Sequence, residues 1–180
     1  MQGIRTDRRK IIFEIIPIVL IVVLILVDQI TKTYFKNLYE NNSWYSTSVI
    51  KDFFAFTYTK NTGAAWSFLA DKDWAQTFFK ILTVVALVLF YGFYIYACKK
   101  NYKFLRYALI LIIGGTIGNF IDRLAYNGVV DFLSFTFGSY NFPIFNLADS
   151  YMTIGIIMMF VHYIFLDENK LFGKNDKQND

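Results

Sequence analysis

The sequence contains only one cysteine, one histidine and two prolines. Cys98 cannot form an internal disulfide, and one cysteine with one histidine cannot build a zinc cluster. We expect His162 to lie roughly 20 Å beyond Asp149 on one helix, too far for a Cys–His pair at the same site. The net charge of +4 is modest, and the basic residues form no stripe suited to nucleic acid. We therefore expect no zinc site and no nucleic-acid partner.

Apolar residues make up 56% of the chain and aromatic residues 20%. A soluble domain of this length could not bury so much apolar surface, whereas a membrane protein exposes it to lipid. The long apolar runs predict an all-α membrane protein, a single domain over 1–180 with four transmembrane helices, at about 11–31, 74–98, 104–124 and 148–166. The first run is long for a signal peptide and lacks a cleavage site, so we expect a retained helix.

Lysine and arginine gather in three regions: before the first helix, in the loop from Lys99 to Arg106, and in the polar tail at 167–180. Four crossings place these regions on one side of the membrane, and the positive-inside rule makes that side cytoplasmic. We therefore expect both termini in the cytoplasm and the segments at about 37–72 and 125–147 outside. The sequence predicts no function for the tail.

The two outer segments show strand patterns. Alternating aromatic residues at 54–58 precede a turn at 61–63, and the valines at 129–130 precede Gly138. Strand edges cannot face lipid, so the two segments should pair with each other or lie at the interface. We expect a small β-rich cradle outside the membrane.

Polar residues that are costly in a membrane concentrate at the outer ends of the expected helices or in the adjoining loop. They are Asp28, Lys32, Asn119, Asp122, Arg123, Asp131, Asn146 and Asp149. Each has an ordinary explanation: Asp28 and Lys32 can form a helical ion pair, and Asn146 with Asp149 can form a capping box. These explanations do not account for the shared level, which indicates a functional site near the outer leaflet.

Two converging carboxylates fit aspartyl proteolysis, in which one carboxylate activates water and the other, protonated, donates to the peptide carbonyl. Asp149 could pair with Asp131 or with Asp122. Asp122 adjoins Arg123, and an ion pair or hydrogen bond with Arg123 or Asn119 would make it a supporting residue. Desolvation and the charge of Asp149 would instead raise one pKa of a pair with Asp131, so the sequence favours Asp131.

Five motifs, all in the same order, resemble those of the lipoprotein signal peptidases, also called signal peptidase II. They are DQITK at 28–32, NTGAAWSF at 61–68, GGTIGNFIDR at 114–123, VVDF at 129–132 and FPIFNLADS at 142–150. The resemblance implies Asp131 and Asp149 as the catalytic pair. The supporting and substrate-binding residues it implies are Asp28, Lys32, Asn61, Gly63, Asn119, Asp122, Arg123 and Asn146. Trp66 and the pair Tyr151-Met152 depart from the residues usual in the family.

The resemblance implies an intramembrane aspartyl endopeptidase of the bacterial cytoplasmic (inner) membrane, with its site near the extracytoplasmic face. Its substrate would be a prolipoprotein whose cysteine carries diacylglycerol, cut just before that cysteine. The resemblance also implies a monomer, no metal or organic cofactor, and inhibition by the cyclic peptide globomycin. From the residues alone, a small transporter or channel subunit that relays protons, or a structural assembly factor, remains an alternative.

Overall fold

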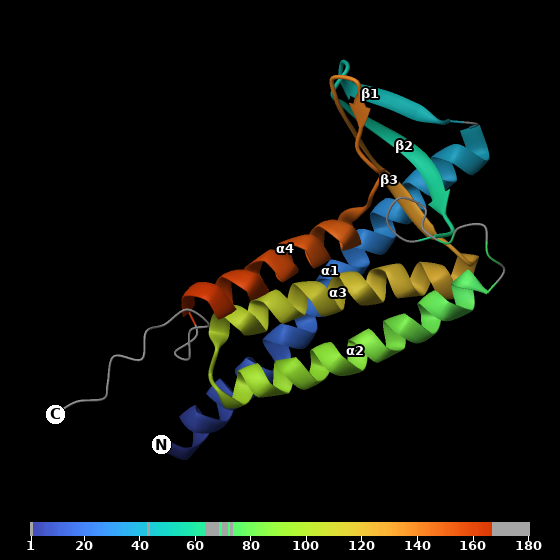
Figure 1. Ribbon diagram of the computed structural model, residues 1–180. Helices are drawn as coiled ribbons and strands as arrows, with labels where there is room; N and C mark the ends of the chain where they lie inside the picture. Colours follow the sequence, from blue (N-terminus) through green and yellow to red (C-terminus); the bar gives the residue numbers. More distant parts are fainter. Residues whose placement is uncertain (1, 43, 64–68, 70–71, 73, 167–180) are drawn as a thin grey trace.

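The computed structural model describes residues 2–42, 44–63, 69, 72 and 74–166, with side chains described from residue 15 onward except at residue 42. Its helices are α1 (Gln2–Asn42), α2 (Ala75–Lys99), α3 (Lys103–Tyr126) and α4 (Leu147–Val161), the last continued by the π-helix η2 (His162–Leu166). The strands are β1 (Ser46–Ile50), β2 (Phe54–Asn61), β3 (Val129–Phe137) and β4 (Tyr140–Asn141). They form a small sheet at one end of the helices (Figure 1). The tail and Trp66 lie outside the described residues.

Four helical segments are long and apolar enough to cross a membrane: Ile15–Asn41, Ala75–Lys99, Lys103–Tyr126 and Leu147–Leu166. The prediction of a mostly helical membrane protein with four such helices is therefore confirmed. α3 is the central helix, because it packs against α1, α2 and α4. Its apolar window is mostly buried, whereas the other three expose most of theirs, as helices that face lipid do.

Small residues bring the central helix close to its neighbours. Gly115 lies against the backbone carbonyl of Ala148 in α4. A Cβ added at Gly118 would come within 2.6 Å of Asp28 Oδ2 in α1. The glycine-rich stretch of α3 thus allows the close helix packing that its pattern indicates. The polar ends of α1, α3 and α4 consequently meet at one level.

The sheet is antiparallel, in the order β1-β2-β3-β4. β2 pairs with β3, so the two segments predicted to contain strands do pair with each other as expected. In this register Thr59 lies opposite Asp131, and Asn61 lies opposite Val129. Asn61 ends β2 and Asp131 lies near the start of β3, which follows α3 directly. The sheet thus places both side chains beside the helix ends.

α1 continues beyond residue 31, where the predicted helix ends, into the segment expected to lie outside the membrane. Phe35 stacks on Phe132 of β3, with ring centroids 4.5 Å apart, and Tyr39 stacks on Tyr58 of β2 at 4.3 Å. Residues four apart share one face of a helix, so both aromatic rings meet the sheet. The sheet thus stabilises these extra helical turns. The polar composition of the segment alone does not predict a helix there.

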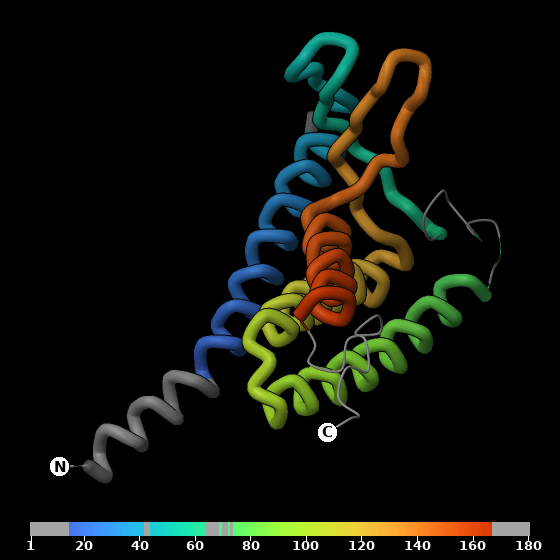
Figure 2. Tube along the Cα trace, turned by 60° about the vertical axis from the view of Figure 1, so that its left-hand side comes forward, coloured from blue at the N-terminus to red at the C-terminus, as the bar shows by residue number. Residues whose placement is uncertain are grey.

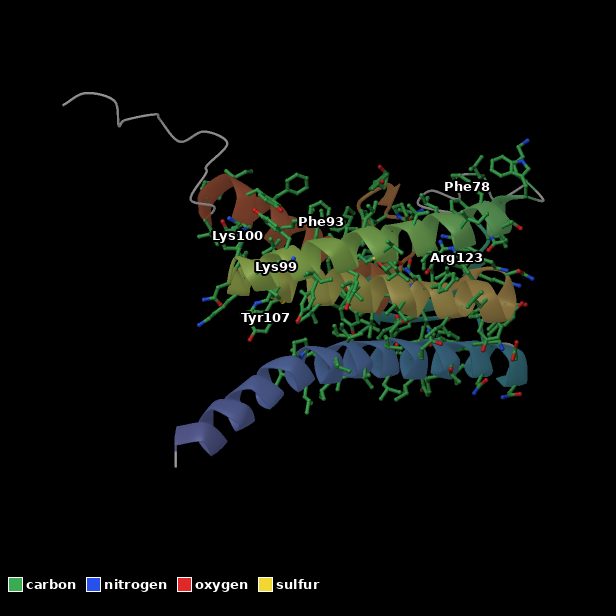
Figure 3. All side chains as sticks on the ribbon, turned by 90° about the horizontal axis from the view of Figure 1, so that it is seen from below. Phe78, Phe93, Lys99, Lys100, Tyr107 and Arg123 are labelled. Atoms are coloured by element: carbon green, nitrogen blue, oxygen red, sulfur yellow. The ribbon has the colours of Figure 1, made fainter. Side chains whose placement is uncertain are left out.

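The start of α1 lies at the end of the bundle away from the sheet (Figure 1), and so does the end of η2 (Figures 1 and 2). Lys99 and Lys100 lie at that same end, whereas Arg123 lies at the opposite end (Figure 3). Four consecutive crossings place the start of α1, the loop between α2 and α3 and the end of η2 at the same end of the bundle. The membrane side on which each end lies stays a prediction from the positive-inside rule.

Candidate active site

The polar residues singled out in the sequence meet where α1, α3 and α4 approach β2 and β3. The buried members are Asp28, Lys32, Gly63, Asn119, Asp122, Asp131 and Asn146, and the partly buried members are Asn61, Arg123 and Asp149. Burying polar groups is costly unless they satisfy one another's hydrogen bonds. Their contacts form one connected network, which brings all ten residues together.

Asn146 joins the two carboxylates. Its Nδ2 donates to Asp131 Oδ1 at 2.7 Å, and its backbone N donates to Asp149 Oδ2 at 3.1 Å. Its Oδ1 accepts from the backbone N of Asp149 at 3.0 Å, so Asn146 is the N-cap of α4 and forms a capping box with Asp149. The ordinary explanation for these two residues therefore holds. The same contacts also place Asp131 and Asp149 against one shared residue.

The other oxygen of each carboxylate has its own donor. Asn61 Nδ2 donates to Asp131 Oδ2 at 3.2 Å, and Asn119 Nδ2 donates to Asp149 Oδ1 at 2.7 Å. The backbone N of Gly63 donates to Asn61 Oδ1 at 2.9 Å, which leaves Nδ2 of Asn61 for Asp131. Four nitrogen donors thus orient the four oxygens of Asp131 and Asp149.

Asp131 lies in β3, outside the membrane-spanning helices, and only 2% of its surface is exposed. Burial and the negative charge of Asp149 raise the pKa of Asp131 to about 7, while the hydrogen bonds from Asn61 and Asn146 oppose that rise. Two neighbouring carboxylates behave in this way because both cannot ionise cheaply. The elevated pKa expected for one member of this pair therefore falls on Asp131.

Behind the pair lies a buried ionic cluster formed by α1 and α3. Lys32 Nζ lies 2.9 Å from Asp28 Oδ2 and 3.3 Å from Asp122 Oδ2, and it donates to Asn119 Oδ1 at 2.8 Å. The helical ion pair expected between Asp28 and Lys32 is therefore present. Asp28 Oδ1 accepts from the backbone N of Ala148 at 3.0 Å, so α1 also supplies a cap to the start of α4.

The partner of Asp122 is Lys32 and not Arg123. Asp122 also accepts from Gln29 Nε2 at 3.0 Å and from the backbone N of Val130 at 3.0 Å. Within the described residues no ion pair joins Asp122 to Arg123. The expectation of an ion pair or hydrogen bond with Arg123 or Asn119 is therefore wrong. Arg123 is the next helical residue and points in a different direction, and the Asn119 amide bonds Lys32, Asn146 and Asp149 instead.

Arg123 extends from α3 toward α2 (Figure 3). Its Cζ lies 5.4 Å from the centroid of the Phe79 ring, and its Nη1 makes a long contact of 3.5 Å with the carbonyl of Asn119. Its Nε is buried and has no hydrogen-bond partner within the described part of the chain. Its connection to the network is the long contact with the carbonyl of Asn119.

Gln29 is a member of the network that sequence reasoning does not single out. Its Nε2 donates to Asp122, to the carbonyl of Gly118 at 3.1 Å and to Asp28 Oδ2 at 3.3 Å. The available signal is its place beside Asp28 at the end of an apolar helix, where any polar side chain is costly. Met152, one of the departures from the family pattern, packs near α3, with Sδ 3.5 Å from Thr116 Oγ1.

The remaining residues considered for other chemistry lie elsewhere. His162 starts η2 at the other end of α4, buried with its ring 4.7 Å from that of Tyr102. Cys98 is exposed near the end of α2. Among the described residues there is no group of three His, Cys, Asp or Glu side chains that could hold a metal ion. The network at the sheet end is therefore the candidate active site.

Known proteins resemble this chain in sequence and in fold. The family profile of signal peptidase (SPase) II matches residues 20–165. The lipoprotein signal peptidase of Bacillus pumilus is 40% identical over 160 residues, covering 87% of this chain and 94% of that protein. The lipoprotein signal peptidase of Clostridium tetani is 41% identical over 161 residues, covering 87% and 99%. A solved structure described as a bacterial membrane enzyme has a TM-score of 0.70 at 34% identity, covering 88% of this chain and 93% of that one. All the predicted site residues lie within the matched range.

Proposed function

The chain belongs to the signal peptidase II family, and we propose that it removes the signal peptide from diacylglyceryl-modified bacterial prolipoproteins with Asp131 and Asp149 as its catalytic pair. Membership of this family makes it a membrane peptidase and decides against the transporter and assembly-factor alternatives. The choice of residues rests on one observation, namely that both carboxylates bind Asn146, through its side chain and its backbone.

Asp131 is the proton donor of the pair, since burial and Asp149 raise its pKa to about 7. Asp149, the other member of the pair, acts as the base and accepts a proton from water as the water oxygen bonds to the peptide carbonyl carbon. Asp131 gives its proton to the carbonyl oxygen, which forms a gem-diol. The amide nitrogen then takes the proton from Asp149, the C–N bond breaks, and Asp131 regains a proton as the carboxylic acid forms.

Asp122 is the competing partner for Asp149, and its contacts argue against a catalytic role. Lys32 balances its charge at 3.3 Å, and the donors from Gln29 and Val130 occupy its oxygens. A carboxylate paired with a cation is a poor partner for sharing a proton. No contact joins Asp122 to Asp149 among the described residues. Asp122 is therefore a supporting residue that connects α3, α1 and β3.

The site lies on the extracytoplasmic side of the bacterial inner membrane in this proposal. Support comes from the basic loop at Lys99 and Lys100, which lies at the other end of the bundle (Figure 3). A substrate acyl chain can then stay in lipid while the peptide bond enters the network. A chain already in the bilayer gains far less than the ~0.8 kcal/mol per methylene of transfer from water, so the lipid acts mainly by positioning the scissile bond.

The direct test incubates the purified protein, in lipid, with diacylglyceryl-modified and with unmodified prolipoprotein. Mass spectrometry should find a product that begins with the lipidated cysteine, formed much faster from the modified substrate, and globomycin should abolish its formation. Equal cleavage rates would remove the role of the lipid. Absence of cleavage of the modified substrate would overturn the proposed function.

A further inference from the structure

The Asn119 side chain must adopt one particular amide orientation to hold Asp149. The two ends of an asparagine amide have nearly the same shape, so neighbouring groups decide which end points where. A carboxylate only accepts hydrogen bonds, hence Nδ2 must face Asp149 in the contact of 2.7 Å. Oδ1 faces Lys32 Nζ at 2.8 Å and Asn146 Nδ2 at 3.1 Å, and both of these groups are donors. A reversed amide would set donors against donors and an acceptor against Asp149.

Lys32 is the group in this arrangement that can act only as a hydrogen-bond donor. An ammonium carries three donors and no acceptor, and Lys32 has three acceptors around it, on Asp28, Asn119 and Asp122. Only 2% of its surface is exposed, and two carboxylates hold its charge in place. Moving the ammonium away would leave those carboxylates buried and unpaired, which is strongly unfavourable.

Asn146 is a weaker constraint on Asn119. Its Nδ2 has two protons but lies near three acceptors, which are Asp131 Oδ1 at 2.7 Å, Asn119 Oδ1 at 3.1 Å and the carbonyl of Val130 at 3.2 Å. The shortest of these contacts goes to Asp131. The ammonium of Lys32, at 2.8 Å, therefore makes the stronger hydrogen bond to Asn119.

We propose that Lys32 is a positioning residue that acts through Asn119, because its buried ammonium fixes the amide so that Nδ2 holds Asp149 Oδ1. The inference rests on the proposed function, since it concerns the orientation of one member of the catalytic pair. It goes further than the ion pair with Asp28, which would stabilise α1 whatever the orientation of Asn119.

Orientation errors at a reacting group lower turnover more than binding. Misplacement by about 1 Å costs on the order of 100-fold in rate. We therefore expect Lys32→Met, measured per active site, to lower kcat about 100-fold while KM changes less than about threefold. Active sites are counted by titration with globomycin, so that loss of folded protein does not register as loss of kcat.

The matched control is Lys36→Met, one turn further along α1. Lys36 Nζ lies 3.7 Å from Glu40 Oε1 and 4.1 Å from the centroid of the Tyr126 ring, so it has an ion pair and no contact with the network. This variant should keep wild-type kcat and KM. Lys32→Arg keeps a positively charged group that donates hydrogen bonds and accepts none. Its kcat should therefore be at least tenfold higher than that of Lys32→Met.

A second variant covers the case in which Lys32→Met does not fold. Asn119→Asp keeps an acceptor for Lys32 but removes the donor to Asp149, so it should show the same loss of kcat with KM retained. If wild type cleaves while Lys32→Met or Asn119→Asp keeps kcat within threefold, the positioning role is wrong and the proposed function stands. A raised KM at unchanged kcat would overturn it equally. If wild type does not cleave, both proposals fail.

Discussion

Asp131 differs from the other buried carboxylates in the groups that contact its side chain. Asp28 and Asp122 share the ammonium of Lys32, whereas the hydrogen bonds to the Asp131 side chain come from the neutral amides of Asn61 and Asn146. A neutral donor opposes the cost of burying a charge less than a cation does. The pKa of Asp131 is raised to about 7, so its protonation changes near neutral pH.

The first prediction concerns the pH dependence of cleavage. Asp131 has to carry a proton to act as the acid, and its pKa is raised to about 7, so kcat should fall as the pH rises through about 7. Asn61→Leu removes a hydrogen bond that lowers this pKa, so it should move the falling limb to higher pH. The measurement is kcat against pH for both proteins. A limb that stays in place or moves to lower pH in Asn61→Leu would contradict the acid role of Asp131.

At the residue scale, the sequence predicts side chains whose partners lie close along the chain. The ion pair of Asp28 with Lys32 follows from a spacing of four residues, and the capping box follows from a spacing of three. The partner of Asp122 could not be predicted in this way. It depends on how α1 rotates against α3, which is set by the close approach at Gly118 and not by a local spacing.

Helix packing positions Asp149, which gives a prediction at the scale of elements. A methyl group added at Gly115 would overlap the carbonyl of Ala148, immediately before Asp149. Gly115→Ala should therefore push α4 from α3, lower the free energy of unfolding by about 1–3 kcal/mol and reduce cleavage. Thermal unfolding and cleavage rate, measured on the same preparation, check both effects.

The matched control for this change is Gly92→Ala in α2. A Cβ at Gly92 meets nothing within 4 Å, so the substitution changes helix propensity without overlap. It should leave cleavage unchanged and leave stability equal or slightly higher. Equal behaviour of the two variants would mean that the close approach of α3 and α4 does not position Asp149.

Element boundaries were predictable where a local pattern exists. Alternation at 54–58 indicates β2, Gly138 indicates the turn before β4, and apolar runs indicate the helices. The strand β1 and its turn to β2 have no such local pattern and were not predicted. The continuation of α1 to Asn42 was not predictable, because it depends on the stacking of Phe35 and Tyr39 on a sheet built from distant segments.

For the whole molecule, the distribution of charge predicts its orientation in the membrane. Lys99 and Lys100, which start the basic loop, lie at the end of the bundle opposite Arg123 (Figure 3). A reporter fused at Lys100 should therefore be active only if it is a cytoplasmic reporter, and one fused at Asp52, between β1 and β2, only if it is an exported reporter. Export of the Lys100 fusion would overturn both the topology and the location of the site.

The central claim is that Asp131 and Asp149 perform the cleavage while Asp122 supports them. Asn is nearly the same size as Asp and differs in charge, so Asp131→Asn, Asp149→Asn and Asp122→Asn form a matched set. Asp122→Asn weakens the contacts to Lys32 and to the backbone N of Val130, and should cost about 1–3 kcal/mol of stability.

The most direct measurement is therefore cleavage of diacylglyceryl-modified prolipoprotein by these three variants, expressed per globomycin-binding site. Asp131→Asn and Asp149→Asn should bind globomycin and release no signal peptide. Asp122→Asn should yield less folded protein, or weaker globomycin binding, while its folded fraction still cleaves. Near-normal turnover by Asp131→Asn, together with a folded but inactive Asp122→Asn, would contradict the assignment of the catalytic pair.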